Sequence, residues 1–310
     1  MDPRSGPIPR ADGSVTGTED RVAGTEDRVA IHRRLLPRRG WLRRATILGG
    51  VAGAGFTADG FAITPYRLVE SRHEIATPGT GAARKAPLRV VQVSDLHLHA
   101  IGRLHRHLLE RLHDARADLI VFTGDMIDRP EGRPALDTFL AECPPGPRRV
   151  AIPGNWEYWS HVPLEEHARI HRRHGAEWLV NRSIVVPHGD RRLRITGLDD
   201  LMGGHPDADG AMAGAEPTDG HLLLIHCPAL RDLPAGAVTA DIALAGHTHG
   251  GQVAPLGFAP VRPPGSGRYV AGWYRDGATP MYVSRGIGTS GLPIRVGAAP
   301  ELVIIDWSIG

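Results

Sequence analysis

Two histidines one residue apart, His247 and His249, follow an apolar segment in the stretch "ALAGHTHGGQ", residues 243–252. Two imidazoles this close repel each other as cations and gain little packing as neutral bases. A bound metal ion would satisfy both, because the neutral imidazole of histidine is a common metal ligand. The sequence therefore predicts a metal site, and other parts of the chain must supply its remaining ligands.

Further polar residues of the right chemistry follow apolar segments in the first half of the chain. The segments "LRVVQVSD", "DLIVFTGD" and "RRVAIPGN" end at Asp95, Asp125 and Asn155. Their ends are 30 residues apart, the length of a strand–helix–strand unit, which predicts parallel strands. The intervening helices are expected near 103–117 and 133–142, from apolar residues at helical spacing. Since the carboxyl ends of parallel strands meet at one sheet edge, these residues should lie together there.

Beyond a helical stretch at 163–176, the pattern changes to β-structure. Two hairpins are expected, at 182–200 and 268–286. Strands are also expected at 221–227, which carries His226 near its end, at 240–250 and at 301–307. A mainly parallel first half and an antiparallel second half predict an α/β fold of two sheets packed face to face, with helices outside.

Five strand ends carry a side chain that can bind a metal. Burying so many polar side chains together costs free energy unless they are paired or bind an ion. Single members have other interpretations: Asn155 as a turn residue and His226 as a core histidine. We take His99 and His161 as non-ligands. The chain has 17 histidines, and three of them lie on a polar helix where solvent would surround them. These three are His105, His107 and His113.

Taken together, the polar blocks resemble those of the calcineurin-like metallophosphoesterases. The five blocks are "DLH" (95–97), "GDMID" (124–128), "GNWE" (154–157), "HCP" (226–228) and "GHTHGGQ" (246–252). The stretch 284–302, "SRGIGTSGLPIRVGAAPEL", extends the likeness to the exported or membrane-associated bacterial subgroup. The resemblance implies a four-layer α/β/β/α sandwich of two mixed sheets flanked by helices, and a two-metal hydrolase.

The resemblance also implies two ligand sets that share Asp125. The first metal would take Asp95, His97, Asp125 and His249. The second would take Asp125, Asn155, His226 and His247. Ligands without thiolate suit two divalent ions of Mn, Fe or Zn. Such a pair can hold a bridging hydroxide and phosphate oxygens for in-line displacement.

One position departs from the family pattern, which has histidine after the metal-binding asparagine, where this chain has Trp156. In relatives that histidine lies near the leaving group and pairs with the residue equivalent to Asp128. An indole N–H donates a hydrogen bond but does not transfer a proton at ordinary pH. We expect Asp128 to hold Trp156 in the same pose, and Glu157 or a metal-bound water to replace the acid. Leaving groups that depart as stable anions should then be favoured.

Two arginines, Arg285 and Arg295, are candidates for contacting substrate phosphate, with surface positions as the alternative for each. The expected function is hydrolysis of a phosphodiester or pyrophosphate in an envelope or lipid-linked substrate. An alternative is a metal-binding homologue whose catalysis is impaired by Trp156. The His-x-His-x-Asp-His run of β-lactamase-like hydrolases is absent from "DLHLHA", which excludes that class.

Three regions are expected along the chain: a disordered tail at 1–35, a twin-arginine-type signal or anchor at 36–63, and a catalytic domain at 64–310. The second contains "RRGWLRRATILGGVAGAGFTA", in which two arginines precede an uncharged run. A buried or amphipathic helix is the alternative. We expect export or membrane anchoring through this segment. The formal net charge of +2 gives no reason to expect nucleic acid as a partner. Cys143 and Cys227 should be free thiols.

Overall fold

The computed structural model describes residues 59–77 and 86–309, all of which belong to one compact unit. The expected tail and most of the expected signal or anchor, residues 1–58, lie outside the described residues. The helices are α2 (Arg103–Ala115), α3 (Arg133–Glu142), α4 (Asn155–Trp159), α5 (Leu164–Arg173) and α6 (Ala208–Met212). The strands are β1 (Val69–Ala76), β2 (Leu88–Val93), β3 (Leu119–Thr123), β4 (Arg148–Ile152), β5 (Ala176–Trp178), β6 (Arg182–His188), β7 (Arg191–Gly197), β8 (Gly220–Leu224), β9 (Ile242–Ala245), β10 (Gly272–Tyr274), β11 (Met281–Val283) and β12 (Glu301–Ser308).

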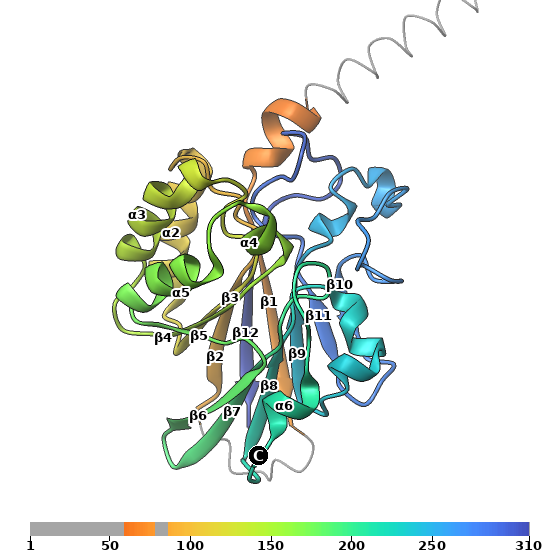
Figure 1. The fold of residues 1–310 in the computed structure, drawn as a ribbon. Helices are drawn as coiled ribbons and strands as arrows, with labels where there is room; N and C mark the ends of the chain where they lie inside the picture. Colours follow the sequence, from red (N-terminus) through yellow and green to blue (C-terminus); the bar gives the residue numbers. More distant parts are fainter. Residues whose placement is uncertain (1–58, 78–85, 310) are drawn as a thin grey trace, which may run out of the picture. The chain divides into compact units, whose positions relative to one another are not determined.

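The first sheet has the strand order β1-β12-β2-β3-β4-β5. Strands β2 to β5 are parallel, as the 30-residue spacing predicts, and β12 pairs antiparallel with β2. Helices α2, α3 and α5 lie over one face of this sheet (Figure 1). Helix α2 buries Leu104, Leu108 and Leu112, which recur every four residues and so share one face of the helix.

The second sheet has the order β10-β11-β9-β8-β7-β6 and corrects one prediction. Both expected hairpins form, β6–β7 and β10–β11. However, β7, β8, β9 and β11 are parallel to one another, so the second half of the chain is mixed and not antiparallel. The reason is the long connections between these strands, such as residues 198–219, which let the chain cross back before the next strand begins.

The two sheets pack face to face through buried apolar side chains from both. Val90 and Val121 of the first sheet belong to one cluster with Leu222 and Leu244 of the second. A third cluster covers the outer face of the second sheet, beneath α6 and several short 3₁₀ turns. The chain therefore has the expected four-layer α/β/β/α sandwich, with two mixed sheets between outer layers (Figure 1).

Two short turns form the amino-terminal end of the described region. A single π-helical turn, Asp59–Ile63, is followed by a 3₁₀ turn, Thr64–Tyr66. The backbone N–H of Arg295 donates to the carbonyl of Gly60 over 2.9 Å, so this turn packs on the loop before β12. Within residues 59–77 and 86–309, no helix has the length and apolar character needed to cross a membrane.

Candidate metal centre

The ends of five strands bring the seven expected ligands to one edge of the sandwich. Asp95, Asp125 and Asn155 follow β2, β3 and β4 of the first sheet, and His226 and His247 follow β8 and β9 of the second. All seven side chains are buried. Six of them, all except Asn155, fall into two groups, and within each group the ligand atoms lie within 4.8 Å of one another. The first group is Asp95, His97 and His249, and the second is Asp125, His226 and His247.

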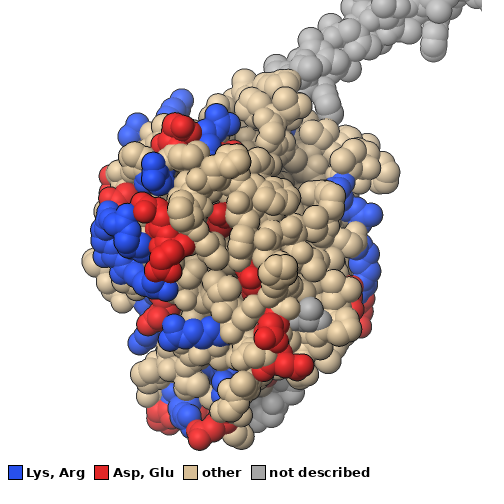
Figure 2. All heavy atoms as spheres, viewed as in Figure 1, with Lys and Arg blue, Asp and Glu red and all other residues tan. Residues whose placement is uncertain are grey.

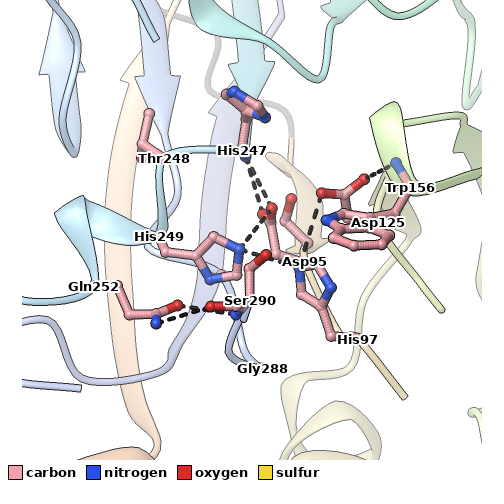
Figure 3. A network of polar contacts seen from close by, with 12 residues as sticks. Asp95, His97, Asp125, Trp156, His247, Thr248, His249, Gln252, Gly288 and Ser290 are labelled. Atoms are coloured by element: carbon pink, nitrogen blue, oxygen red, sulfur yellow. Dashed lines mark hydrogen bonds and ion pairs between the residues drawn. The ribbon is translucent and has the colours of Figure 1, made fainter. Parts of the chain in front are cut away.

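In the first group, Asp95 and His97 approach the imidazole of His249 (Figure 3). Its Nε2 atom lies 3.1 Å from Nε2 of His97 and 3.5 Å from Oδ1 of Asp95. The Asp95 carboxylate also accepts the backbone N–H of His247, at 3.0 Å and 3.2 Å for its two oxygens. Asp95 is thereby fixed to the loop that carries both histidines of the "GHTHGGQ" stretch.

The second group contains Asn155 as well. Oδ1 of Asn155 lies 2.9 Å from Nδ1 of His247 and 3.2 Å from Nε2 of His226. The two imidazole nitrogens are 3.3 Å apart. Oδ2 of Asp125 lies 3.2 Å from Nε2 of His226. Together with Oδ1 of Asn155 and the two imidazole nitrogens, it makes a set of four possible ligand atoms around one centre.

Asp125 lies between the two groups. Its Oδ2 atom is 3.2 Å from Nε2 of His226 and 3.8 Å from Nε2 of His97. Its Oδ1 atom accepts the backbone N–H of Trp156 over 2.8 Å (Figure 3). One carboxylate therefore reaches ligand atoms on both sides, which is the position that a bridging ligand of two ions requires.

Hydrogen bonds on the far side of two histidines set which nitrogen faces the centre. Nδ1 of His226 is 2.7 Å from the carbonyl oxygen of Thr123, and Nε2 of His247 is 2.7 Å from the carbonyl oxygen of Pro264. A carbonyl only accepts, so each of these nitrogens carries a proton. In the neutral rings, the opposite nitrogens then present lone pairs to the centre, as in histidines that bind metals.

The buried carboxylates of this site are also suited to binding cations. Asp95 and Asp125 are almost fully buried, and within the described part of the chain neither carboxylate forms an ion pair with arginine or lysine. Burial, the largest effect, raises the pKa of Asp95 to about 6. Burial also opposes charge on Asp125 and His226, yet their mutual attraction lowers the pKa of Asp125 and raises that of His226 well above its usual value. A proton on His226 is thus the available counter-charge, and a divalent cation would replace it.

Backbone geometry at the site is unusual. Asp95, His97, Asp125, His247 and His249 all have positive φ, between 45° and 71°. Non-glycine residues rarely adopt this conformation, and such strain gathers at functional sites. The five side chains leave the sheet edge at angles that an extended strand would not give.

Glu157 has a structural place in the site. Its carboxylate is fully buried and accepts the backbone N–H groups of Asp125, Met126 and Gly154, at 2.7 to 2.8 Å. Burial, followed by the nearby charge of Asp125, raises the pKa of Glu157 to about 8. Both oxygens accept from backbone donors. Glu157 does not line the cavity that opens beside the candidate ligands. The expected replacement acid therefore holds the ends of β3 and β4 in register.

Asp128 does not hold Trp156, which corrects the expected pose. The ionisable groups closest to the Asp128 carboxylate are the imidazole of His99, at 3.4 Å, the guanidinium of Arg129, at 3.7 Å, and the imidazole of His97, at 3.9 Å. No hydrogen bond joins Asp128 to the indole of Trp156, both of which the structure describes. The indole instead lies edge-on to the ring of His97, with 6.1 Å between ring centroids, and to that of Trp159, at 5.9 Å.

The two arginine candidates are both engaged by the protein. Arg285 pairs with Glu301 over 3.1 Å and donates to the carbonyl of Ala299, and it does not line the cavity. Arg295 is fully buried, which neither expected interpretation anticipated. Its guanidinium donates to carbonyl oxygens of the 285–298 loop and lies 3.2 Å from Nδ1 of His249. No sequence signal separates such an arginine from a surface one.

A cavity of about 610 Å³ opens beside the two groups. Its polar floor includes Asp125, Asn155, His247 and His249. The walls are mostly apolar, from the residues Trp156, Trp159, Met202, Val253, Pro260, Val261, Pro263, Pro264, Leu292 and Ile294. The cavity therefore places a cluster of metal-competent atoms beside apolar walls in a space of ligand size.

The four-layer fold and the paired, cavity-facing ligand groups define a metallohydrolase of the two-sheet α/β class. The family model of the calcineurin-like phosphoesterases matches residues 88–251, more than half of the chain, and the chain belongs to that family. It is 28% identical to "Uncharacterized metallophosphoesterase YkuE" of Bacillus subtilis over 83% of this chain and 93% of that protein. It is also 28% identical to "Phosphodiesterase YaeI" of Escherichia coli, over 86% and 99%. A further relative is "Uncharacterized metallophosphoesterase YkoQ" of Bacillus subtilis, 28% identical over 72% and 84%.

Proposed function

We propose that this phosphoesterase hydrolyses a phosphodiester or pyrophosphate bond with two divalent cations of Mn, Fe or Zn. The position of Asp125 carries the proposal, because its carboxylate lies between two groups of ligand atoms beside a cavity. Asp95, His97 and His249 would hold one cation, and Asn155, His226 and His247 the other. Bound together, two such ions make water a nucleophile at neutral pH and clamp phosphate oxygens.

The protein's own groups orient this centre. The backbone N–H of Trp156 donates to Oδ1 of Asp125, and the carbonyl oxygen of Thr123 accepts from Nδ1 of His226. The Trp156 ring forms part of the cavity wall next to Asp125. Because indole does not transfer a proton at ordinary pH, the site favours leaving groups that depart as stable anions, such as aryl phosphates and phosphoanhydrides.

The apolar cavity walls support a substrate that carries an apolar part, such as a lipid-linked phosphodiester of the cell envelope. The twin-arginine-type sequence at 38–58 supports an exported or membrane-anchored location. Cell fractionation with and without Arg38→Lys and Arg39→Lys tests this part: retention of the wild-type protein in the cytoplasm would contradict it.

The test of the reaction uses the full chain, freed of metal by a chelator and reloaded with Mn²⁺, on bis(p-nitrophenyl) phosphate. We expect Mn²⁺-dependent turnover, and His226→Ala should lower it by at least about 100-fold, since even partners of metal ligands cost 10–100-fold. His107→Ala, at an exposed position on α2, is the matched control and should keep its turnover. Tight Mn²⁺ binding without turnover of any phosphodiester would instead support the catalytically impaired alternative.

A further inference from the structure

Large apolar side chains project into solvent from the segments that line the cavity and from those that adjoin it. We call Phe61, Ile63, Leu256, Phe258, Val261 and Leu292 the apolar rim; each is between 48% and 107% exposed. Of the eleven exposed large apolar side chains among the described residues, four line the cavity: Trp159, Met202, Val261 and Leu292. Five more, Phe61, Ile63, Tyr66, Leu256 and Phe258, lie on the adjoining segments 59–66 and 254–258. Only Val185 and Leu233 lie elsewhere. Soluble proteins rarely expose apolar residues in such a concentration unless the surface binds something.

Hydrogen bonds join the three segments that carry the rim. The Arg295 N–H donates to the Gly60 carbonyl, which joins the amino-terminal turn to the loop before β12. The backbone N–H of Ala254 donates to the Val296 carbonyl over 2.7 Å. The side-chain Nε2 of Gln252 donates to the Leu292 carbonyl over 3.1 Å. Val261 and Leu292 also line the same cavity.

The rim segments carry few charges, of which Asp59 and the exposed Arg262 lie at their ends. No Asp, Glu, Lys or Arg occurs from residue 242 to residue 261. Between Arg285 and Glu301 the only charged residue is Arg295, which is fully buried. Figure 2 shows the result: on the upper part of this face, over α4 and the loops to its right in Figure 1, the surface is almost entirely uncharged.

We propose that the apolar rim inserts into the surface of a lipid bilayer, so that the cavity opens toward lipid. The position of the amino-terminal sequence favours lipid over a protein partner. The uncharged run Ala45–Ala58 ends where the described chain begins, at the turn that carries Phe61 and Ile63. The cavity also leads from the rim, along apolar walls, to the ligand residues. Apolar side chains that insert at the interface bind by buried apolar area, and so do not need anionic lipid.

The first test reads contact with lipid at a single position of the full chain. Both native cysteines are buried, and burial raises the pKa of Cys143 to about 12 and that of Cys227 well above its usual value. A new cysteine can therefore be labelled selectively with an environment-sensitive fluorophore. Leu256→Cys places the label in the rim, and Val185→Cys places the control on β6, far from α4 in Figure 1.

Labelled protein is mixed with phosphatidylcholine vesicles that contain nitroxide-labelled lipid. We expect a blue shift and quenching of the label at position 256, and neither change at position 185. Both effects should persist in about 0.5 M NaCl, where exposed charges are strongly screened. Vesicle binding without quenching at position 256 would overturn the proposal, because the amino-terminal segment would then be the only lipid contact. Equal quenching at both positions would overturn it as well.

The second test removes the rim without touching the cavity. The variant Phe61→Ser/Leu256→Ser/Phe258→Ser changes three exposed side chains that do not line the cavity, and Val185→Ser/Leu233→Ser is the control. We expect the rim variant to lose at least about tenfold in vesicle partitioning, since each large apolar side chain contributes to insertion. The control should bind as the wild type does, and turnover of a soluble aryl phosphodiester should be unchanged in both.

The same pair of variants tests a protein interface. If the wild type forms a dimer in sedimentation velocity, the rim variant is monomeric, and neither binds vesicles, then the rim is a surface for a second copy and the lipid proposal is wrong. Failure of the aryl phosphodiester assay in the wild type would count against the proposed reaction alone, because lipid contact is measured separately.

Discussion

Asp125 illustrates how single residues build this centre. Its left-handed backbone turns the carboxylate back over the sheet edge, and a neighbouring N–H fixes one oxygen while the other approaches imidazoles on both sides. The carboxylate is buried without a permanent cationic partner among the described residues. Such a group is costly unless a proton or a metal ion neutralises it, which ties its electrostatics directly to cation binding.

Trp156→His should restore a proton donor beside the leaving group. We expect the rate on an alkyl phosphodiester to rise relative to the rate on an aryl one by at least about tenfold, because general acid catalysis matters most for poor leaving groups. Steady-state rates on the two substrates measure this. Trp159→His, in the same cavity wall, is the control and should leave the ratio unchanged. An equal change on both substrates in Trp156→His would refute the leaving-group argument.

Gly154→Ala should disable the centre at the residue before Asn155. An added Cβ would lie 2.4 Å from Oδ1 of Asp125 and 2.8 Å from Cε1 of His226, so both ligands must shift. We expect Mn²⁺ affinity and turnover to fall by about 100-fold, as measured by calorimetric titration and hydrolysis. In Gly146→Ala the added Cβ meets nothing within 4 Å, and both quantities should match the wild type. Wild-type behaviour of Gly154→Ala would contradict the tight packing of Gly154 against Asp125 and His226.

At the scale of elements, the sequence predicted most of what positions the site. Apolar runs that end in Asp95, Asp125 and Asn155 at equal spacing identify parallel strands, and α2 and α3 occur where their apolar spacing predicts them. The sequence does not predict the parallel pairing of β7, β8, β9 and β11. A short buried strand has the same apolar pattern whether its neighbour is parallel or antiparallel. The sequence does not predict the buried positions of Arg295 and Glu157, because most of their partners are backbone groups, which carry no sequence signature.

Helix α5 gives a prediction about acid stability. His171 is fully buried between the rings of Phe122 and Trp178, its Nδ1 atom donates to the His167 carbonyl, and its Nε2 atom has no partner. Burial lowers the pKa of His171 to about 4, against about 6.5 in the unfolded chain. Between these values the unfolded state binds the extra proton, so stability falls as the pH falls from about 6.5 to about 4.

His171→Phe should therefore weaken the acid dependence of unfolding. We expect the difference in Tm between pH 7.5 and pH 5 to be smaller in the variant than in the wild type, as measured by calorimetry in the presence of a chelator. His107→Phe, at an exposed position, should leave the wild-type difference intact. An unchanged difference in His171→Phe would mean that this histidine does not contribute to the acid sensitivity.

At the scale of the whole molecule, the metal centre is a junction between the two sheets. Asp95, Asp125 and Asn155 come from the first sheet, and His226 and His247 come from the second, so the candidate ligands come from both sides of the sandwich. The same edge carries the cavity and the apolar rim. Binding and chemistry are thus concentrated at the carboxyl ends of the strands, where open α/β sheets form their sites.

Cation binding should consequently stabilise the entire fold. A ligand at 100 times its Kd adds about 2.7 kcal/mol to the free energy of unfolding, so we expect Mn²⁺ to raise Tm by several degrees over chelator-treated protein. The shift should be smaller in His249→Ala, which removes a ligand of one group only. Thermal scans across a Mn²⁺ titration measure both. A Tm that Mn²⁺ leaves unchanged would separate these residues from metal binding.

The most direct test of the central claim is anomalous diffraction from crystals of the full chain soaked in Mn²⁺. We predict two anomalous peaks about 3.5–4 Å apart. One should lie against Asp95, His97 and His249, the other against Asn155, His226 and His247, with the Asp125 carboxylate between them. No peak at these side chains, or a single peak that Asp125 does not contact, would contradict the two-cation account.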